Sequence, residues 1–189
     1  LDHWFDTGFE VFVNNGTFRK SSGAGIGTFS VALQNQFGLV EVLSGTLRFD
    51  RGQQLDGTFF AGPGTVIQFN TGTSTYTALT KFTGTGQYQL TGGTLQGLLD
   101  YLPNLSLLGG NVGLSPNYQT NGRIGRLDLD GSTLTGSNVV IGVLNLNSGS
   151  LSGSVTVASN GVLNWKEGGV SASLAVQSNG VGHLLTRGS

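Results

Sequence analysis

Apolar and polar residues alternate in a short pattern that returns along the chain. From Leu127 the sequence reads LDLDGSTLTG, from Leu144 LNLNSGSLSG and from Leu163 LNWKEGGVSA. Each segment has apolar residues at its first and third positions, then a turn that usually contains Gly, then an apolar residue at the eighth position. A period of two is typical of a β-strand with one buried face. The pattern predicts strands joined by tight turns, with Leu127 and Leu129 pointing inward and Asp128 outward.

The same frame recurs through most of the chain. It fits VFVNNGTFRK, VEVLSGTLRF, YQLTGGTLQG and LSLLGGNVGL, and it fits the first half of IQFNTGTSTY, where Ser74 takes the eighth position. The segments start at positions 11, 40, 67, 88, 105, 127, 144 and 163. After two longer intervals, the spacing settles near the roughly 20 residues that one turn of a β-solenoid uses. We therefore predict an all-β fold, a single-stranded parallel β-helix (β-solenoid) of about eight or nine coils.

Stacked coils place equivalent side chains above one another, about 4.8 Å apart. Two interior ladders are expected. The first contains Val40, Ile67, Tyr88, Leu105, Leu127, Leu144 and Leu163, and the second contains Val42, Phe69, Leu90, Leu107, Leu129, Leu146 and Trp165. Trp165 is therefore interpreted as a core residue rather than a platform for a sugar.

Glycine follows the third position of most segments and predicts corners with positive φ, which glycine adopts without steric cost. The expected corners are Gly16, Gly45, Gly72, Gly93, Gly110, Gly149 and Gly168. Gly131 comes one residue early in its segment and predicts a different turn.

The chain is expected to form one domain, with residues 11–189 as stacked coils and residues 1–10 as an N-terminal cap that uses Trp4, Phe5 and Phe9. The first two intervals are long and predict extended loops at residues 21–27 and 51–57. Residues 117–122 are polar and follow Pro116, so we expect a protruding loop there.

Two other folds, a helical fold and a β-sandwich or meander, agree less well with the sequence than the solenoid does. A helix is disfavoured because glycine recurs every few residues, at about 1 kcal/mol each in a helix interior. A β-sandwich or meander also has short, regularly spaced strands. The register that the successive units of roughly 20 residues share favours the solenoid.

Composition narrows the range of partners. Charged residues make up 10% of the chain, the net charge is -1, and the basic residues are scattered, which disfavours nucleic acid and anionic membranes as partners. The chain has no Cys and no Met, so thiol chemistry is excluded and the sequence is expected to be a fragment of a larger protein. No apolar run of about 18 residues predicts a transmembrane segment.

Two stretches, NNGTFRKSSGAGIGTFSVALQNQFGLVEVLSGTLRF and SGSLSGSVTVASNGVLNW, resemble the β-strand-repeat regions of bacterial autotransporter passenger domains and large surface adhesins. The resemblance covers nearly the whole chain and concerns a structural repeat. It implies a right-handed coil, export through the bacterial envelope, and display at the cell surface or secretion as a rigid stalk.

Candidate chemistry centres on one outward strip. Asp128 and Asp130 lie two apart on a strand, so both face the same side at roughly 7 Å, and glycoside hydrolysis needs two carboxylates about 5 to 10 Å apart. The favoured interpretation, however, is that both are solvated, outward-facing surface residues. We treat them as the catalytic pair only if the protein is an enzyme.

The next coils extend this strip, which predicts an amide ladder or a shallow sugar-binding face. The candidate ligand-binding residues are Asp128, Asp130, Asn145, Asn147, Asn164, Lys166 and Tyr118. Tyr118 is included because Tyr76, Tyr101 and Tyr118 fall in or near loops, where aromatic rings can stack on carbohydrate.

No cofactor and no metal site are predicted. Calcium prefers several oxygen ligands, and the nonapeptide of calcium-binding β-rolls is absent. His3 and His183 lie at opposite ends of the chain, which excludes a shared zinc site or a Ser-His-Asp triad. The glycine-rich stretches lack a phosphate-binding motif.

We therefore expect a structural or adhesive surface module rather than an enzyme, with a carbohydrate-binding or polysaccharide-degrading β-helix as the alternative. The expected partners are an extracellular polysaccharide or another cell-surface ligand, and open solenoid ends allow end-to-end or lateral self-association. Ice binding would need a flat array of threonines. Thr73, Thr75 and Thr77 do not recur at one position of the frame, so no such face is expected.

Overall fold

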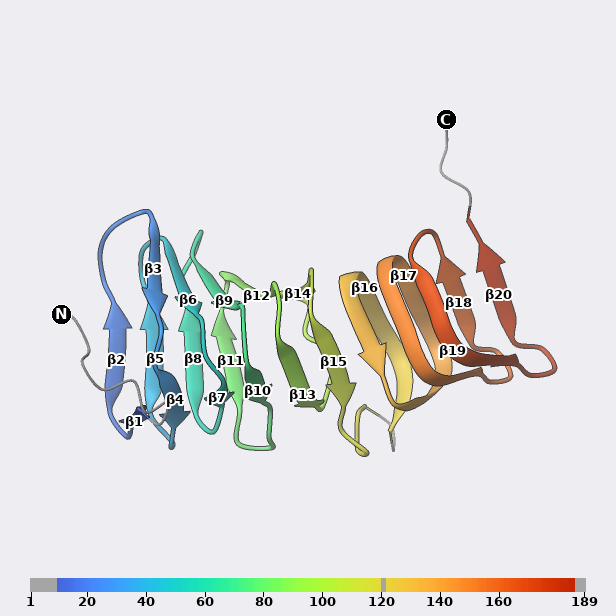
Figure 1. Ribbon diagram of the computed structural model, residues 1–189, viewed down its shortest axis with the longest axis horizontal. Coiled ribbons are helices and arrows are strands. Elements are labelled where there is room, and N and C mark those ends of the chain that lie inside the picture. The colour runs from blue at the N-terminus through green and yellow to red at the C-terminus, as the bar shows by residue number, and fades with distance from the viewer. Residues whose placement is uncertain (1–9, 120–121, 186–189) are drawn as a thin grey trace.

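The computed structural model describes residues 10–119 and 122–185, and these form an all-β solenoid. About nine turns stack along the long axis, from β1 and β2 at one end to β20 at the other (Figure 1). Every strand pairing among the described residues is parallel, which confirms the β-solenoid and excludes the sandwich and meander, whose neighbouring strands are antiparallel. The right-handed sense of the coil stays a prediction.

The first half of the solenoid has three walls, each a parallel sheet, and the chain visits them in turn (Figure 1). Sheet A contains β1 (Val11–Asn14), β4 (Ala32–Asn35), β7 (Gln53–Gln54), β10 (Thr73–Thr75), β13 (Thr94–Leu98) and β15 (Asn111–Leu114). Sheet B contains β2 (Thr17–Lys20), β5 (Leu39–Val42), β8 (Thr58–Ala61) and β11 (Lys81–Gly84). Sheet C contains β3 (Ile26–Phe29), β6 (Thr46–Phe49), β9 (Val66–Phe69), β12 (Gln87–Leu90) and β14 (Leu105–Leu107).

The second half is built from longer strands. Sheet A continues through β16 (Arg123–Thr135), β17 (Ser137–Val157), β18 (Val162–Trp165), β19 (Gly169–Val176) and β20 (Val181–Leu184). β17 is long enough to pair with both β18 and β19, so one strand bends through the corners that turns occupy in the first half. No long apolar helix that could cross a bilayer occurs among residues 10–119 and 122–185.

The pairing register corrects the predicted coil lengths. One inward column of sheet A contains Phe12, Leu33, Gln53, Ser74, Leu95, Val112, Leu134, Leu151 and Val170. Its members follow one another at roughly 20 residues from the first coil to the last. The long intervals predicted before Ile67 were wrong, and the first coils are as regular as the later ones. Residues 21–27 and 51–57 are not insertions, because they contain the start of β3 and all of β7.

The interior ladders are confirmed from Ile67 to Leu105 and from Leu127 to Leu163, and they are wrong before Ile67. Ile67 pairs with Tyr88, and Leu127 pairs with Leu144, which pairs with Leu163. Val40 and Val42, however, lie on sheet B, and the true partners of Ile67 and Phe69 are Leu47 and Phe49. At the first segment, Phe12 and Asn14 occupy the inward positions that were predicted for Val11 and Val13.

The second half joins the first through sheet A alone. β15 pairs with β16, whereas β14 contacts β16 without any ladder pair in the described residues. The predicted ladder therefore has a break between Leu105 and Leu127. Its last member, Trp165, pairs with Leu146, is half-buried and packs against the core, as expected for a core residue near the end of the stack.

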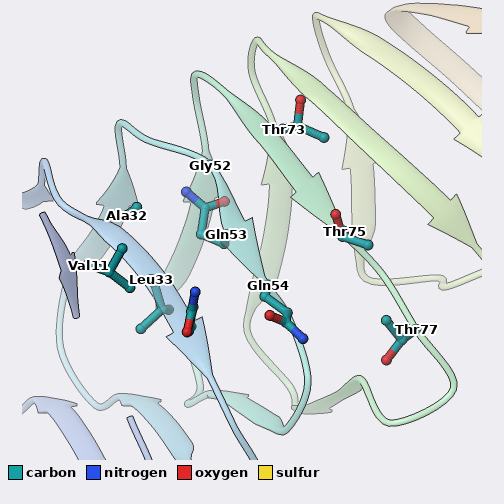
Figure 2. A pocket seen from close by; sticks show the side chains of 10 residues that line it. Val11, Ala32, Leu33, Gly52, Gln53, Gln54, Thr73, Thr75 and Thr77 are labelled. Atoms are coloured by element: carbon teal, nitrogen blue, oxygen red, sulfur yellow. The ribbon is translucent and has the colours of Figure 1, made fainter. Parts of the chain in front are cut away.

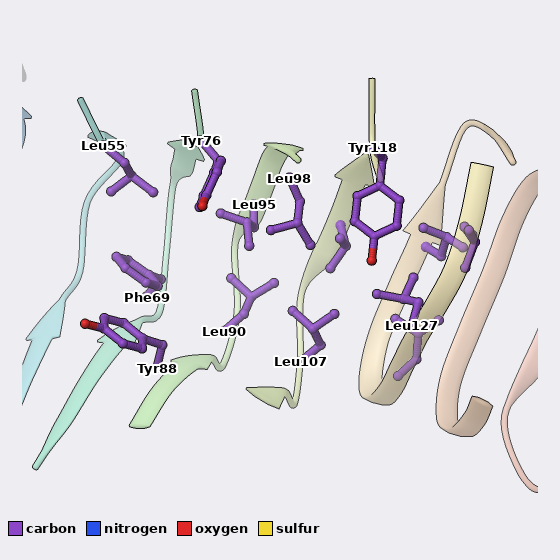
Figure 3. Close-up of a cluster of buried hydrophobic side chains, with 14 of the residues drawn as sticks. Leu55, Phe69, Tyr76, Tyr88, Leu90, Leu95, Leu98, Leu107, Tyr118 and Leu127 are labelled. Atoms are coloured by element: carbon purple, nitrogen blue, oxygen red, sulfur yellow. The ribbon is translucent and has the colours of Figure 1, made fainter. Parts of the chain in front are cut away.

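The core changes composition along the axis. In the first half, nine aromatic rings form a continuous chain of contacts: Phe12, Phe18, Phe29, Phe49, Phe59, Phe69, Tyr76, Phe82 and Tyr88. The second half is filled mainly by Leu and Val, and Figure 3 shows the transition from Phe69 and Tyr88 to Leu127.

Coil length changes along with the core. In the inward column of sheet A, successive partners are 20 or 21 positions apart from Phe12 to Leu95, and then 17, 22, 17 and 19 positions apart from Leu95 to Val170. A longer coil encloses more space than a shorter one, and larger side chains keep that space close-packed. The aromatic rings therefore suit the uniformly long coils of the first half.

Six of the seven corner glycines have the predicted positive φ, with values from 65° to 97°. Gly16 does not, and no heavy atom lies near the position of its Cβ. Gly131 also lacks positive φ, in agreement with a different turn there. A Cβ on Gly131 would lie 2.0 Å from the carbonyl oxygen of Leu108, so close approach of two coils requires glycine at that position.

Two further predictions concern the periphery of the solenoid, an N-terminal cap and a protruding loop at residues 117–122. The N-terminal cap with Trp4, Phe5 and Phe9 lies outside the described residues. The loop at residues 117–122 was expected to protrude, but its Tyr118 is fully buried and donates a hydrogen bond to the carbonyl of Arg126 at 2.9 Å. Burial of this ring folds that part of the segment against the core.

Candidate functional site

The predicted polar strip exists, and its amides bond to one another along the stack. Strand register places Asn145 between Asp128 and Asn164. The Asn164 amide donates to Asn145 Oδ1 at 2.8 Å, and the Asn145 amide donates to Asp128 Oδ1 at 2.6 Å. His183 occupies the next position of this column, beside Asn164. The strip is therefore an amide ladder, one of the two forms predicted for it.

Asp128 has donors on both carboxylate oxygens. Besides the amide on Oδ1, its Oδ2 accepts bonds from Arg126 Nη2 at 3.1 Å and from the Tyr101 hydroxyl at 3.2 Å. The Arg126 guanidinium also lies 5.0 Å from the centroid of the Tyr101 ring, a cation–π distance. The hydrogen bond to Asp128, followed by the charge of that carboxylate, raises the pKa of Arg126. Asp128 is thus the centre of a surface cluster that positions Tyr101.

Asp130, Asn147 and Lys166 form a looser continuation of the strip. Asn147 donates to Asp130 Oδ1 at 2.8 Å, although a register shift after Leu129 places Asp130 opposite Ser148. Asp130, Asn147 and Lys166 are all exposed. The structure thus brings the two carboxylates onto one surface, and each accepts a hydrogen bond from an asparagine of the next coil.

The tyrosines were expected to offer their rings at the surface, and for two of them this was wrong. Tyr118 and Tyr76 are buried in the core cluster, and burial raises the pKa of both hydroxyls, with a smaller contribution from the charge of Asp100. Tyr101 is half-buried. Tyr118 therefore cannot act as a surface platform for a sugar ring.

Other polar ladders were missed by the sequence frame. On sheet C, Gln68 donates to Gln89 Oε1 at 2.8 Å. At the adjacent corner, Asn70 donates to Asp50 at 2.8 Å, and Thr91 donates to Asn70 at 3.1 Å. A search for polar residues repeated at 20 or 21 positions would have found both ladders, because these spacings match the coils of this part of the chain.

A different polar surface lies on sheet A, over the first coils. Figure 2 shows an open depression there, of about 300 Å³, whose lining includes Gln54, Thr73, Thr75 and Thr77. None of the described residues that line it is charged. This surface also corrects the threonine prediction, because Thr73 and Thr94 share one outward column, which continues through Asn111 to Thr133. Hydroxyl groups therefore do recur at one position of the solenoid.

Chemical groups that hold metals are not clustered in the part of the chain that the structure describes, where no three His, Asp or Glu side chains come together. His3 lies outside that part, and His183 is exposed on β20. No family model, no curated protein and no solved structure matches this chain. The geometry of the solenoid and its faces is therefore the basis for assigning a function.

Proposed function

We propose that this chain is a rigid structural and adhesive module of an exported bacterial surface protein. The observation that carries the proposal is the uninterrupted stacking of sheet A from β1 to β20, which joins about nine coils in one parallel ladder. Backbone hydrogen bonds along the axis and a filled interior make such a stack stiff, and each coil adds about 4.8 Å of length. The resemblance to autotransporter passenger domains supports surface display.

The proposal is tested by removing one coil in register. Deleting residues 54–74 joins Gln53 to Thr75, which lies in the register position of Gln54, and so removes one whole turn. The chain has no cysteine, so Thr17→Cys and Ser173→Cys, both at exposed positions near opposite ends, supply unique labelling sites. Electron–electron resonance between spin labels should give a narrow distance distribution that shortens by about 4.8 Å in the deletion.

A broad distribution, or an unchanged mean distance in the folded deletion variant, would contradict a rigid rod. Deletion of residues 54–63 serves as the control, because half a coil cannot restore the register and should unfold the neighbouring turns. Surface display is tested separately with an antibody against the chain on intact cells of the bacterium that produces it. Labelling only after lysis would contradict display.

The catalytic alternative makes its own prediction. If Asp128 and Asp130 formed a hydrolytic pair, the double variant Asp128→Asn and Asp130→Asn would abolish polysaccharide cleavage. The donors around both oxygens of Asp128 favour a structural role instead. We therefore expect the purified wild-type chain to release no reducing ends from a panel of polysaccharides, and any release that the double variant abolishes would reverse this assignment.

A further inference from the structure

Two outer surfaces of the solenoid are polar, and they use their polar groups differently. On sheet C the amides of Gln68 and Gln89 bond to each other, and on β17 and β18 so do those of Asn145 and Asn164. Each pair uses one donor and one acceptor along the stack. A ligand at this surface would therefore compete with bonds between coils.

We call face A the outer surface of β4, β7, β10, β13 and β15 together with the parts of β16, β17 and β19 that continue their column, and no charged residue points outward from these segments. Its outward residues are Ala32, Gln34, Gln54, Thr73, Thr75, Thr94, Gln96, Asn111, Gly113, Thr133, Thr135, Ser150, Ser152, Gly169 and Ser171. In the middle of face A, the side chains of Thr73, Thr75, Thr94, Gln96 and Asn111 have no hydrogen-bond partner among the described residues. Hydroxyl and amide groups on three consecutive coils are therefore free to bind a ligand.

Face A is also hollowed along the solenoid axis. The depression over β4, β7 and β10 includes Thr77 in its lining (Figure 2). Thr77 also lines a second depression of about 300 Å³, together with Gln96, Leu99 and Leu114 among others. Within the described ranges, neither depression is lined by a charged residue. Asp56, a carboxylate at the corner, accepts hydrogen bonds from two lining residues, Gln54 and Thr77. Together the two depressions form a shallow uncharged groove along the first half of the solenoid.

We propose that face A binds a neutral polysaccharide chain that lies along this groove, an inference that rests on the adhesive role proposed above. Sugar hydroxyls both donate and accept hydrogen bonds, which complements free Thr, Gln and Asn side chains. A charged polymer would lose its hydration here without gaining a counter-ion. Successive coils lie about 4.8 Å apart, close to the length of one sugar ring, so successive rings meet polar groups of successive coils. Leu99 and Leu114 offer apolar contacts to the ring faces.

The test is affinity electrophoresis of the full chain through gels containing dextran, mannan, xylan or mixed-linkage β-glucan, with alginate as the acidic comparison. We expect retardation by at least one of the neutral polymers and none by alginate. The double variant Thr73→Glu and Gln96→Glu should weaken this retardation by about tenfold or more, because it loses several hydrogen bonds. The double variant Thr28→Glu and Gln87→Glu adds the same charge to exposed positions of sheet C and should bind like the wild type.

A second pair of variants guards against unfolding. Thr75→Val and Thr94→Val keep the shape and the β-propensity of threonine but remove its hydroxyl, and they should weaken binding while leaving the unfolding midpoint nearly unchanged. Four outcomes would overturn the inference: no neutral polymer retards the chain; alginate retards it more strongly; the face A variants bind like the wild type; or the chain shapes ice crystals without retaining any polysaccharide. The spin-label distances test the rigid rod independently of binding. Absence of polysaccharide binding together with the expected distances would contradict the role of face A and leave the rigid rod unaffected.

Discussion

At the residue scale, the solenoid depends on a few positions where only one side chain fits. Corner glycines combine two constraints, a positive φ and a close approach of the neighbouring coil. A Cβ on Gly45 would lie 2.4 Å from the carbonyl oxygen of Gly23, while Gly64 has a similar φ of 71° and nothing within 4 Å of its Cβ position. These two residues therefore separate backbone strain from steric conflict.

We predict that Gly45→Ala destabilises the chain by about 3 kcal/mol or more, since it adds a clash with backbone to the cost of a left-handed conformation. Gly64→Ala should cost only about 1 kcal/mol, from backbone strain. Gly16→Ala, which has neither constraint, should be nearly neutral. Urea unfolding of the three variants measures these differences. Equal costs for Gly45→Ala and Gly64→Ala would show that coil contact contributes nothing.

Tyr88 gives the fold a sensitivity to alkaline pH. Its buried hydroxyl lies 2.7 Å from the carbonyl oxygens of both Phe59 and Thr83, which share its single proton, and burial raises the pKa of Tyr88 to about 12. The folded state therefore retains a proton that the unfolded state releases near pH 10. The stability contributed by neutral Tyr88 is complete below pH 10 and is lost as the pH rises toward 12.

We predict that the wild type loses unfolding free energy between pH 10 and 12 and that Tyr88→Phe loses less over the same range. At pH 7 the variant should be about 1 to 2 kcal/mol less stable, because two buried carbonyls lose a donor. Chemical unfolding at several pH values provides the comparison. Identical pH slopes for the two proteins would assign the alkaline loss to other tyrosines, of which Tyr76 and Tyr118 also have raised pKa values.

At the element scale, each strand contributes one inward row, and the aromatic rows fix the width of the first coils. Phe49 contacts Phe29, Phe59 and Phe69, one ring from each neighbouring wall or coil. Fully buried at this crossing, it connects sheet B with sheet C. The strands of the first half thus depend on rings that bridge two walls as well as on ring contacts within one sheet.

We predict that Phe49→Ala costs about 3 to 5 kcal/mol, since it leaves a cavity among rings that cannot collapse into it. Phe49→Leu should cost less, because a branched aliphatic side chain fills part of the space. Phe37→Ala is the control, since this ring is 78% exposed and should contribute almost nothing. Thermal unfolding ranks the three variants. A small cost for Phe49→Ala would indicate that the first coils are loosely packed.

At the scale of the whole molecule, one coil boundary in the described part of the solenoid is crossed by strand pairing in only one of the three sheets. Sheet B ends at β11 and sheet C ends at β14, so the pairing of β15 with β16 alone carries the ladder into the second half. Earlier boundaries of sheet C are joined by paired strands, such as β6 with β9. The two halves also differ in core composition. The boundary is therefore where the stack is held by few backbone hydrogen bonds.

We predict that amide hydrogens of β14 exchange faster than those of β9, which has paired strands on both sides. Local opening needs less free energy where ladder bonds are missing. Hydrogen exchange followed by mass spectrometry on the intact chain measures this difference. Equal protection of β9 and β14 would indicate that side-chain contacts between β14 and β16 replace the missing ladder.

The sequence alone determined the fold class, the inward and outward residues of most strands, and six of the seven corner glycines. These follow from local rules, since a strand alternates with a period of two and tight corners favour glycine. The amide ladder through Asn145 also followed, because its spacings of 17 and 19 positions match two coils of the correct frame.

Only the tertiary structure decided which wall each strand occupies. The same alternation is present on all three walls, so the frame that starts at Val40 matched sheet B, while the frame that starts at Ile67 matched sheet C. For the same reason, the sequence pattern did not predict the burial of Tyr118 or the free hydroxyls of face A. Both depend on which coil lies above a residue, and that is set by closure of each turn rather than by the pattern within one strand.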